Sequence, residues 1–166
     1  MIRVLVVDDH AFVREGLRAF LDLQDGIEVV GEAADGEDGL AEAERLQPDV
    51  VLLDLVMPRL DGVAALRALR ERLPGTRAIV LTSFLDEDKL LPALRAGAVG
   101  YVLKNSPPAE VVRAVRAASA GEAVLDPAAA ARLIDALAHV EEPLDRLTPR
   151  EREVLVLLGQ IGRAHV

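Results

Sequence analysis

The sequence predicts an α/β fold with a doubly wound, five-stranded parallel sheet. Short runs rich in Val, Ile and Leu alternate with segments whose apolar residues recur at helical spacing. This alternation is typical of buried parallel strands joined by helices. Turn-forming pairs such as Asp25-Gly26, Asp35-Gly36 and Asp61-Gly62 separate the two kinds of segment. Successive strand–helix units imply right-handed crossovers, with helices on both faces of the sheet.

Each expected strand is a short apolar run, and each expected helix follows a turn signal or a polar residue. The strands are expected at residues 2–7, 27–32, 49–53, 77–82 and 99–103. The helices are expected at residues 11–22, 36–46, 61–72, 86–96 and 107–120. Gly97 lies just past the fourth helix, where a helix favours glycine as its terminator.

The chain changes character after residue 120. Residues 121–146 contain one helical segment, at about 127–140, which begins at Asp126-Pro127. No strand is expected in this region. We interpret residues 121–146 as a linker with a helical segment. An extra helix packed on the first domain is the alternative.

A second domain begins after this linker. In residues 147–160, Thr148 and Glu151 form a capping box at the start of a new helix. The final residues 161–166, IGRAHV, do not continue this helical pattern. Back-translated, they match a reading frame through a common sequencing-adapter oligonucleotide. We therefore expect residues 161–166 to be non-native read-through, and an irregular natural C-terminus is the alternative.

Composition excludes several classes of protein. The chain of 166 residues has a net charge of −9, so it should repel nucleic-acid phosphates. No apolar stretch approaches the ~20 residues of a membrane span, and no secretory signal precedes the first strand. The absence of cysteine excludes disulfides and thiolate metal sites. We therefore expect a cytoplasmic protein that does not bind membranes.

Polar residues lie at the carboxyl ends of four of the expected strands. They are Asp8, Asp9, Asp54, Thr82 and Lys104. In an open α/β sheet, ligands bind in the crevice outside the carboxyl ends of the strands. Three carboxylates, a hydroxyl and an ammonium should therefore converge on one pocket.

These residue types predict a magnesium site and phosphoryl chemistry. Asp8, Asp9 and Asp54 would repel one another without a cation, and Mg²⁺ prefers oxygen ligands. One of the adjacent pair could instead cap the following helix. Asp54, kept ionised, could act as a nucleophile and form an acyl phosphate. Lys104 would pair with the carboxylates and clamp a phosphoryl group, and the Thr82 hydroxyl could reach a phosphoryl oxygen.

Together with Met57-Pro58 and Tyr101, this ordered set resembles the receiver domain of bacterial two-component response regulators. The segments GEAADGEDGL, LTSF, GYVLK and LTPREREVL resemble the NarL/FixJ family with a LuxR-type helix-turn-helix, in its LiaR/VraR-like subgroup. The resemblance implies a receiver at residues 1–120 with the flavodoxin-like strand order 2-1-3-4-5. It also implies that residues 147–160 begin a truncated DNA-binding domain.

The resemblance assigns the acidic residues specific roles. Asp54 would be the phosphoacceptor and would take the phosphoryl group from a phosphohistidine on a sensor histidine kinase. Asp9, Asp54 and the carbonyl of Val56 would ligate Mg²⁺, and Asp8 would act through water. The domain would not be an enzyme in the ordinary sense, although it would promote its own phosphorylation and dephosphorylation.

The resemblance also implies a switch. Thr82 and Lys104 would hold the phosphoryl group, and Tyr101 would rotate inward in its presence. Phosphorylation would drive homodimerisation, and DNA would be bound by the full-length protein but not by this fragment. Many receivers have Lys-Pro where this chain has Lys104-Asn105, so the geometry there cannot be carried over. His10 is expected only to begin the first helix.

Two apolar residues predict a slow loss of the phosphoryl group. Val56 and Phe84 lie two residues beyond Asp54 and Thr82, and their side chains should hinder an attacking water.

Other classes remain open on sequence. A haloacid-dehalogenase-type phosphatase also uses an aspartate nucleophile and Mg²⁺, but it needs a second Asp where this chain has Val56. A flavodoxin-like electron carrier needs a phosphate-binding loop after the first strand. The third alternative is a stand-alone receiver that acts as an interaction module.

Overall fold

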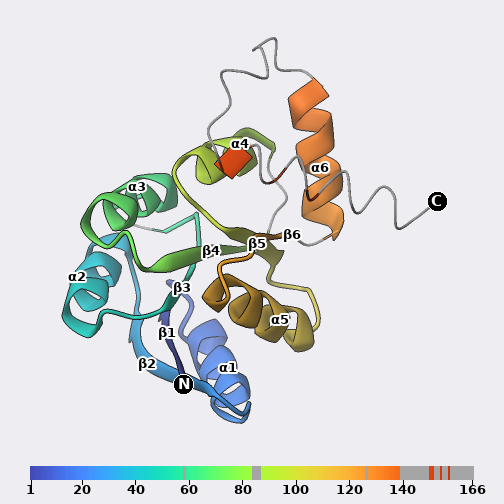
Figure 1. The fold of residues 1–166 in the computed structure, drawn as a ribbon. Coiled ribbons are helices and arrows are strands. Elements are labelled where there is room, and N and C mark those ends of the chain that lie inside the picture. Colours follow the sequence, from blue (N-terminus) through green and yellow to red (C-terminus); the bar gives the residue numbers. More distant parts are fainter. Residues whose placement is uncertain are drawn as a thin grey trace.

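A computed structural model describes residues 1–57, 59–83, 87–125 and 127–138, together with residues 150, 151, 154 and 157. Its strands are β1 (Ile2–Val7), β2 (Ile27–Ala33), β3 (Val50–Leu53), β4 (Arg77–Thr82), β5 (Gly100–Leu103) and β6 (Val124–Leu125). Its helices are α1 (Ala11–Asp22), α2 (Gly36–Leu46), α3 (Gly62–Arg72), α4 (Glu87–Arg95), α5 (Pro108–Ser119) and α6 (Pro127–Ala138). The sheet has the order β2-β1-β3-β4-β5-β6, and every neighbouring pair is parallel (Figure 1). The predicted α/β class and the order of the first five strands are confirmed.

Helices cover both faces of the sheet because successive strand residues point to opposite sides. In β1, Val4 and Val6 pack in the core beneath α1 and α5. Leu5 and Val7 pack in the second core, beneath α2, α3, α4 and α6. Figure 1 shows these two helical layers on either side of the strands. Both strand faces are therefore apolar, which explains the continuous apolar runs in the sequence.

The strand register aligns the carboxyl ends at one edge of the sheet. Val7 at the end of β1 pairs with Leu53 at the end of β3. Thr82 at the end of β4 pairs with Leu103 at the end of β5. The residues that follow these four strands are thus brought to the same edge, as the sequence predicted.

The region after α5 differs from its interpretation as a linker. Val124 and Leu125 form β6, which pairs with Gly100 and Tyr101 of β5, so the expectation of no strand here is wrong. Helix α6 contacts α4 and β5, and Leu133 on α6 is 1% exposed. The alternative interpretation, a helix packed on the first domain, therefore describes residues 127–138. Sequence periodicity could not predict this strand because two residues are too few to show alternation.

Parts of the C-terminal segment also contact the receiver core. Residues 150, 151, 154 and 157 are helical, in line with the helix expected there. Glu151 is buried and its Oε2 lies 3.3 Å from Nε of Arg95, and Val154 is buried in the same core as α4 and α6. Thr148 of the capping box and residues 161–166 lie outside the described residues. No helix among the described residues is both long and apolar enough to span a bilayer.

Candidate functional site

The end of β1 presents one buried and one accessible carboxylate. The N–H of Asp8 donates to the carbonyl of Ala33 at 3.0 Å and continues the pairing of β1 with β2. The side chain of Asp8 is 2% exposed, whereas that of Asp9 is 32% exposed. The N–H of His10 donates to Oδ1 of Asp8 at 2.8 Å and fixes the turn between them. Asp9 is therefore the carboxylate at the mouth of the site.

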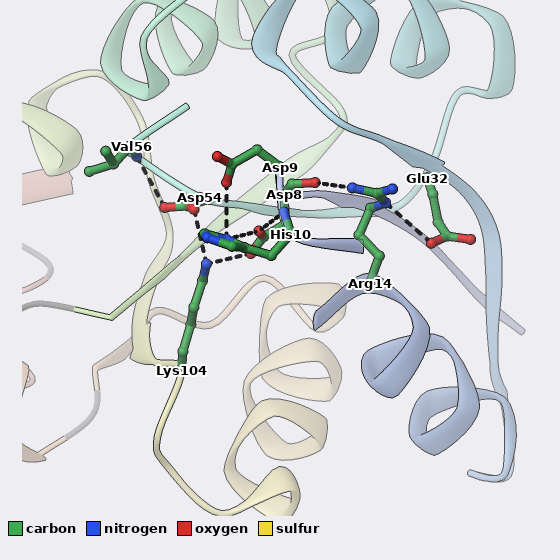
Figure 2. Close-up of polar contacts among 8 residues, drawn as sticks. All are labelled: Asp8, Asp9, His10, Arg14, Glu32, Asp54, Val56 and Lys104. Carbon is green, nitrogen blue, oxygen red and sulfur yellow. Dashed lines mark hydrogen bonds and ion pairs between the residues drawn. The ribbon is translucent and has the colours of Figure 1, made fainter. Parts of the chain in front are cut away.

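Asp54 lies beside this turn because β3 is paired with β1. Its N–H donates to the carbonyl of Val7 at 3.0 Å. Its side chain is 5% exposed, and Oδ1 accepts a hydrogen bond from the N–H of Val56 at 3.0 Å. The carboxylate is thus held at the end of the strand, with the half-exposed Val56 side chain beside it. Figure 2 shows the contact between Asp54 and Val56.

Lys104 joins the two buried carboxylates. Its Nζ lies 2.6 Å from Oδ2 of Asp8 and 2.9 Å from Oδ2 of Asp54, and the side chain is 11% exposed (Figure 2). Burial alone would lower the pKa of Lys104, but hydrogen bonds and charge interactions with Asp8 and Asp54 together outweigh burial and raise that pKa. Lys104 is therefore a cation at neutral pH. All described peptide bonds are trans, including the one that follows Lys104.

Thr82 and Tyr101 lie in the interior close to this edge. The carbonyl of Thr82, the last residue of β4, accepts a hydrogen bond from the N–H of Lys104 at 2.7 Å, and Lys104 directly follows β5. Thr82 is 3% exposed and Tyr101 is 0% exposed. Tyr101 packs with the core beneath α2, α3 and α4. The structure thus has Tyr101 in an inward position.

The loop between β3 and α3 is held by contacts that leave no room for a side chain at Gly62. A Cβ at Gly62 would lie 2.5 Å from Cα of Leu55. The N–H of Gly62 also donates to the carbonyl of Leu55 at 3.1 Å. Asp61 caps α3, since its Oδ1 accepts from the N–H of Ala64 at 2.9 Å. This packing fixes the path of the chain just after Asp54.

Two residues at this edge were not predicted from the sequence. Nδ1 of His10 lies 2.9 Å from Oδ1 of Asp8 and 3.1 Å from Oδ1 of Asp9. Nη1 of Arg14 donates to the carbonyl of Asp8 at 2.6 Å, and its Nε lies 3.5 Å from Oε1 of Glu32. His10 immediately precedes α1 and Arg14 lies in its first turn, where the N–H of Arg14 donates to the carbonyl of His10 at 3.1 Å. Their position, directly after two aspartates, was the available signal.

The donor set fits a divalent cation. Asp8, Asp9 and Asp54 each offer an oxygen and His10 offers a nitrogen, and these atoms lie within 4.8 Å of one another. Hard cations such as Mg²⁺ take carboxylate and carbonyl oxygens together with water. Lys104 supplies one positive charge to three carboxylates, so a divalent cation would balance the charge that remains. The structure therefore brings together three of the predicted metal ligands, Asp8, Asp9 and Asp54. Phe84 and Pro58 lie outside the described residues.

Comparison with known proteins places this fold and site in a family. The response regulator receiver domain matches residues 4–116. The chain is 48% identical over 163 residues to the transcriptional regulatory protein LiaR of Bacillus subtilis, and the match covers 96% of this chain and 77% of LiaR. It is 39% identical over 159 residues to the response regulator protein VraR of Staphylococcus aureus, with 96% of this chain and 76% of VraR covered.

A solved structure agrees with these relatives. The crystal structure of a LuxR-family two-component response regulator from Aurantimonas has a TM-score of 0.78 and 36% sequence identity. The match covers 82% of this chain and 98% of that chain.

The fold, the acidic edge formed by Asp8, Asp9 and Asp54, and these matches define the class of protein. The chain belongs to the response regulator family and has a receiver domain. Within that family it is a LuxR-type, LiaR-like response regulator. It is therefore a phosphorylation-activated component of a two-component system that controls transcription.

Proposed function

We propose that Asp54 is the phosphoacceptor of this response regulator. The observation that carries the proposal is the position of its carboxylate, which is buried at the carboxyl end of β3 between the Val56 N–H and the Lys104 ammonium. Membership of the response regulator family implies a sensor histidine kinase as the donor. We further propose that the domain promotes transfer to itself and later hydrolysis, so that it acts as a timed switch.

The transfer is a displacement at phosphorus. An oxygen of Asp54 attacks the phosphorus of a phosphohistidine, a P–O bond forms, the P–N bond breaks, and the leaving imidazole takes up a proton. Mg²⁺, held by Asp9, Asp54 and the Val56 carbonyl with Asp8 acting through water, would neutralise phosphoryl oxygens. Lys104 would then exchange part of its contact with Asp54 for a phosphoryl oxygen. The negative charge of the Asp54 carboxylate is thus replaced by the negative charge of the phosphoryl group.

The readout proposed for this switch uses β4 and β5. A phosphoryl group carries about −1.5 to −2 charges at pH 7. We propose that the Thr82 hydroxyl and Lys104, which lie at the ends of adjacent strands, would bind this group, and that the buried Tyr101 would report its presence. Contacts present in one conformation and not in the other shift the population of the surface formed by α4 and β5. We propose that this shift favours a homodimer.

The domain division remains a proposal. It consists of a receiver at 1–120, a linker with a helical segment at 121–146, the truncated start of a LuxR-type domain at 147–160, and non-native read-through at 161–166. We propose that the full-length protein binds DNA and that the present 166 residues, with a net charge of −9, do not. A cytoplasmic location is proposed, where the kinase would present its phosphohistidine.

The test is mass spectrometry after incubation with acetyl phosphate and Mg²⁺. The native chain should gain the mass of one phosphoryl group, and Asp54→Ala should gain none. Asp61→Ala, which removes an exposed carboxylate that caps α3, is the matched control and should still be labelled. Labelling of Asp54→Ala equal to that of the native chain would exclude Asp54. Continuous turnover of phosphate esters would instead support the phosphatase, which the comparisons do not favour.

A further inference from the structure

His10 faces the acidic site, although its sequence position suggested only the start of a helix. It is the residue before α1, and its side chain makes no hydrogen bond that caps this helix. The imidazole instead turns toward the carboxylates, with Nδ1 within 3.1 Å of Asp8 and Asp9 (Figure 2). The side chain is 62% exposed, so this orientation is not imposed by burial.

Lys104 and His10 contact different oxygens of the carboxylates. Nζ of Lys104 contacts Oδ2 of Asp8 and Oδ2 of Asp54. Oδ1 of Asp8 and Oδ1 of Asp9 are the oxygens next to His10. The imidazole and the ammonium thus lie against different oxygens of the same acidic cluster. A cation between the Oδ1 atoms would meet a nitrogen donor as well.

The spacing of these atoms suits ligands of one ion. Two neighbouring ligands, each about 2.1 Å from an octahedral ion, are about 3 Å apart. The distances from Nδ1 to the two carboxylate oxygens, 2.9 Å and 3.1 Å, agree with that value. They also suit hydrogen bonds, so the two roles must be separated by experiment. Neutral imidazole is a good ligand for Co²⁺, Ni²⁺ and Zn²⁺, whereas Mg²⁺ prefers oxygen.

We infer that His10 is a nitrogen ligand of the receiver's cation site, so that this site binds first-row transition cations such as Co²⁺ through Asp8, Asp9, Asp54 and His10 in addition to Mg²⁺. The inference rests on the proposed function, because it assumes the cation site beside Asp54. It adds a dependence on the identity of the metal. The cation would determine whether the imidazole contributes to the site.

The test is isothermal titration calorimetry of the chain with Co²⁺ and, separately, with Mg²⁺. His10→Ala should lower Co²⁺ affinity by at least about tenfold, the loss seen when even an outer partner of a metal ligand is removed. Mg²⁺ affinity should change by less than about threefold, since Mg²⁺ needs only the oxygens. Retained Mg²⁺ binding also shows that the variant is folded. The visible spectrum of bound Co²⁺ should shift as nitrogen is replaced by oxygen.

His10→Asn separates a ligand from a residue that only orients the carboxylates. The amide can still donate a hydrogen bond to Asp8 or Asp9, but it is a poor substitute for imidazole. This variant should lose Co²⁺ affinity as His10→Ala does. The double variant His139→Asn/His165→Asn, which removes the other two histidines, should bind Co²⁺ like the native chain.

Three results would overturn the inference: no Co²⁺ binding by the native chain, equal losses for both metals in His10→Ala, or recovery of Co²⁺ binding in His10→Asn. Phosphorylation with acetyl phosphate and Mg²⁺ is a separate measurement. Failure of that labelling would refute the proposed function, whereas unchanged Co²⁺ binding in the His10 variants would refute the nitrogen ligand alone.

Discussion

Among single residues, Lys104 supplies the positive charge that partly neutralises Asp8 and Asp54. Lys104→Met keeps an apolar stem and removes the ammonium, which leaves Asp8 and Asp54 buried without their cationic partner. Breaking a buried ion pair in this way costs about 3–5 kcal/mol. We expect urea unfolding in a chelator to show this loss, and added Mg²⁺ to restore more stability to the variant than to the native chain. Lys89→Met, which removes the other lysine, is the control, and an equal effect of both variants would contradict the prediction.

The pKa of Lys104 also predicts how this contribution depends on pH. The pKa is raised in the folded protein, so the stabilisation is complete below the unfolded lysine pKa of about 10.4 and is lost as pH rises through the higher folded value. The part of the difference in unfolding free energy between the native and Lys104→Met chains that comes from Lys104 should therefore stay constant from about pH 6 to about pH 9. It should shrink only at more alkaline pH, which chemical denaturation at several pH values would measure. The same comparison can be made in a chain whose three histidines are replaced by asparagine. If the stabilisation from Lys104 fell between pH 6 and pH 9 in that chain, this assignment would be contradicted.

The apolar side chain of Val56 is expected to lengthen the lifetime of the phosphoryl group on Asp54. Its side chain is 53% exposed, and its N–H donates to the carboxylate of Asp54, the proposed phosphoacceptor. The Val56→Asn/Phe84→Glu variant replaces two apolar side chains with groups that can orient water. We expect its phosphorylated form to decay about tenfold faster, equivalent to about 1.4 kcal/mol of barrier. Decay after removal of acetyl phosphate measures this, with Leu23→Asn as a remote exposed control, and equal lifetimes would refute the prediction.

Among the elements, the junction of β3 and α3 depends on a close approach of two backbones. Gly62→Ala would place a Cβ 2.5 Å from Cα of Leu55, and backbone atoms cannot move aside as a flexible side chain can. We expect a loss of about 1–3 kcal/mol in unfolding free energy and slower labelling of Asp54, because the loop that carries Val56 must shift.

Gly16→Ala is the matched control for this change. Gly16 lies on the exposed face of α1, where an added Cβ would meet no other atom within 4 Å. Alanine should therefore stabilise that helix by about 0.5–1 kcal/mol. Thermal unfolding of both variants gives the comparison, and a similar response at the two glycines would argue against a close approach at Gly62.

At the scale of the whole molecule, α6 lies in the proposed linker but packs against α4 and β5. Leu133 is 1% exposed, whereas its neighbour Ile134 is 53% exposed. Leu133→Ala should cost about 2–5 kcal/mol if α6 is docked as the structure has it. Ile134→Ala should change stability by no more than about 0.5 kcal/mol. Urea unfolding distinguishes them, and two equally small effects would return residues 127–138 to the role of a detached linker.

Most of the architecture could be predicted from the sequence because its signals are local. The apolar runs of β1, β3, β4 and β5 each end at a polar residue, and parallel pairing brings such ends to one edge. The acidic pair, Asp54 and Lys104 could therefore be placed together before their distances were known. The roles assigned to these side chains remain proposals, which the labelling experiment addresses.

The local sequence pattern could not predict the features that depend on three-dimensional packing. Strand β6 has two residues and forms only because β5 offers an unpaired edge, and α6 is buried because the surface of α4 and β5 receives it. The imidazole of His10 likewise turns toward Asp8 and Asp9 through a turn whose path no periodicity describes. The sequence by itself determined the α/β class, the strand order implied by its family and the residues at the acidic edge. Only the three-dimensional structure decided the sixth strand and the docked helix, since both depend on surfaces made by residues distant in the chain. It also decided the position of the His10 nitrogen, which depends on the path of the local turn from Asp8 to His10.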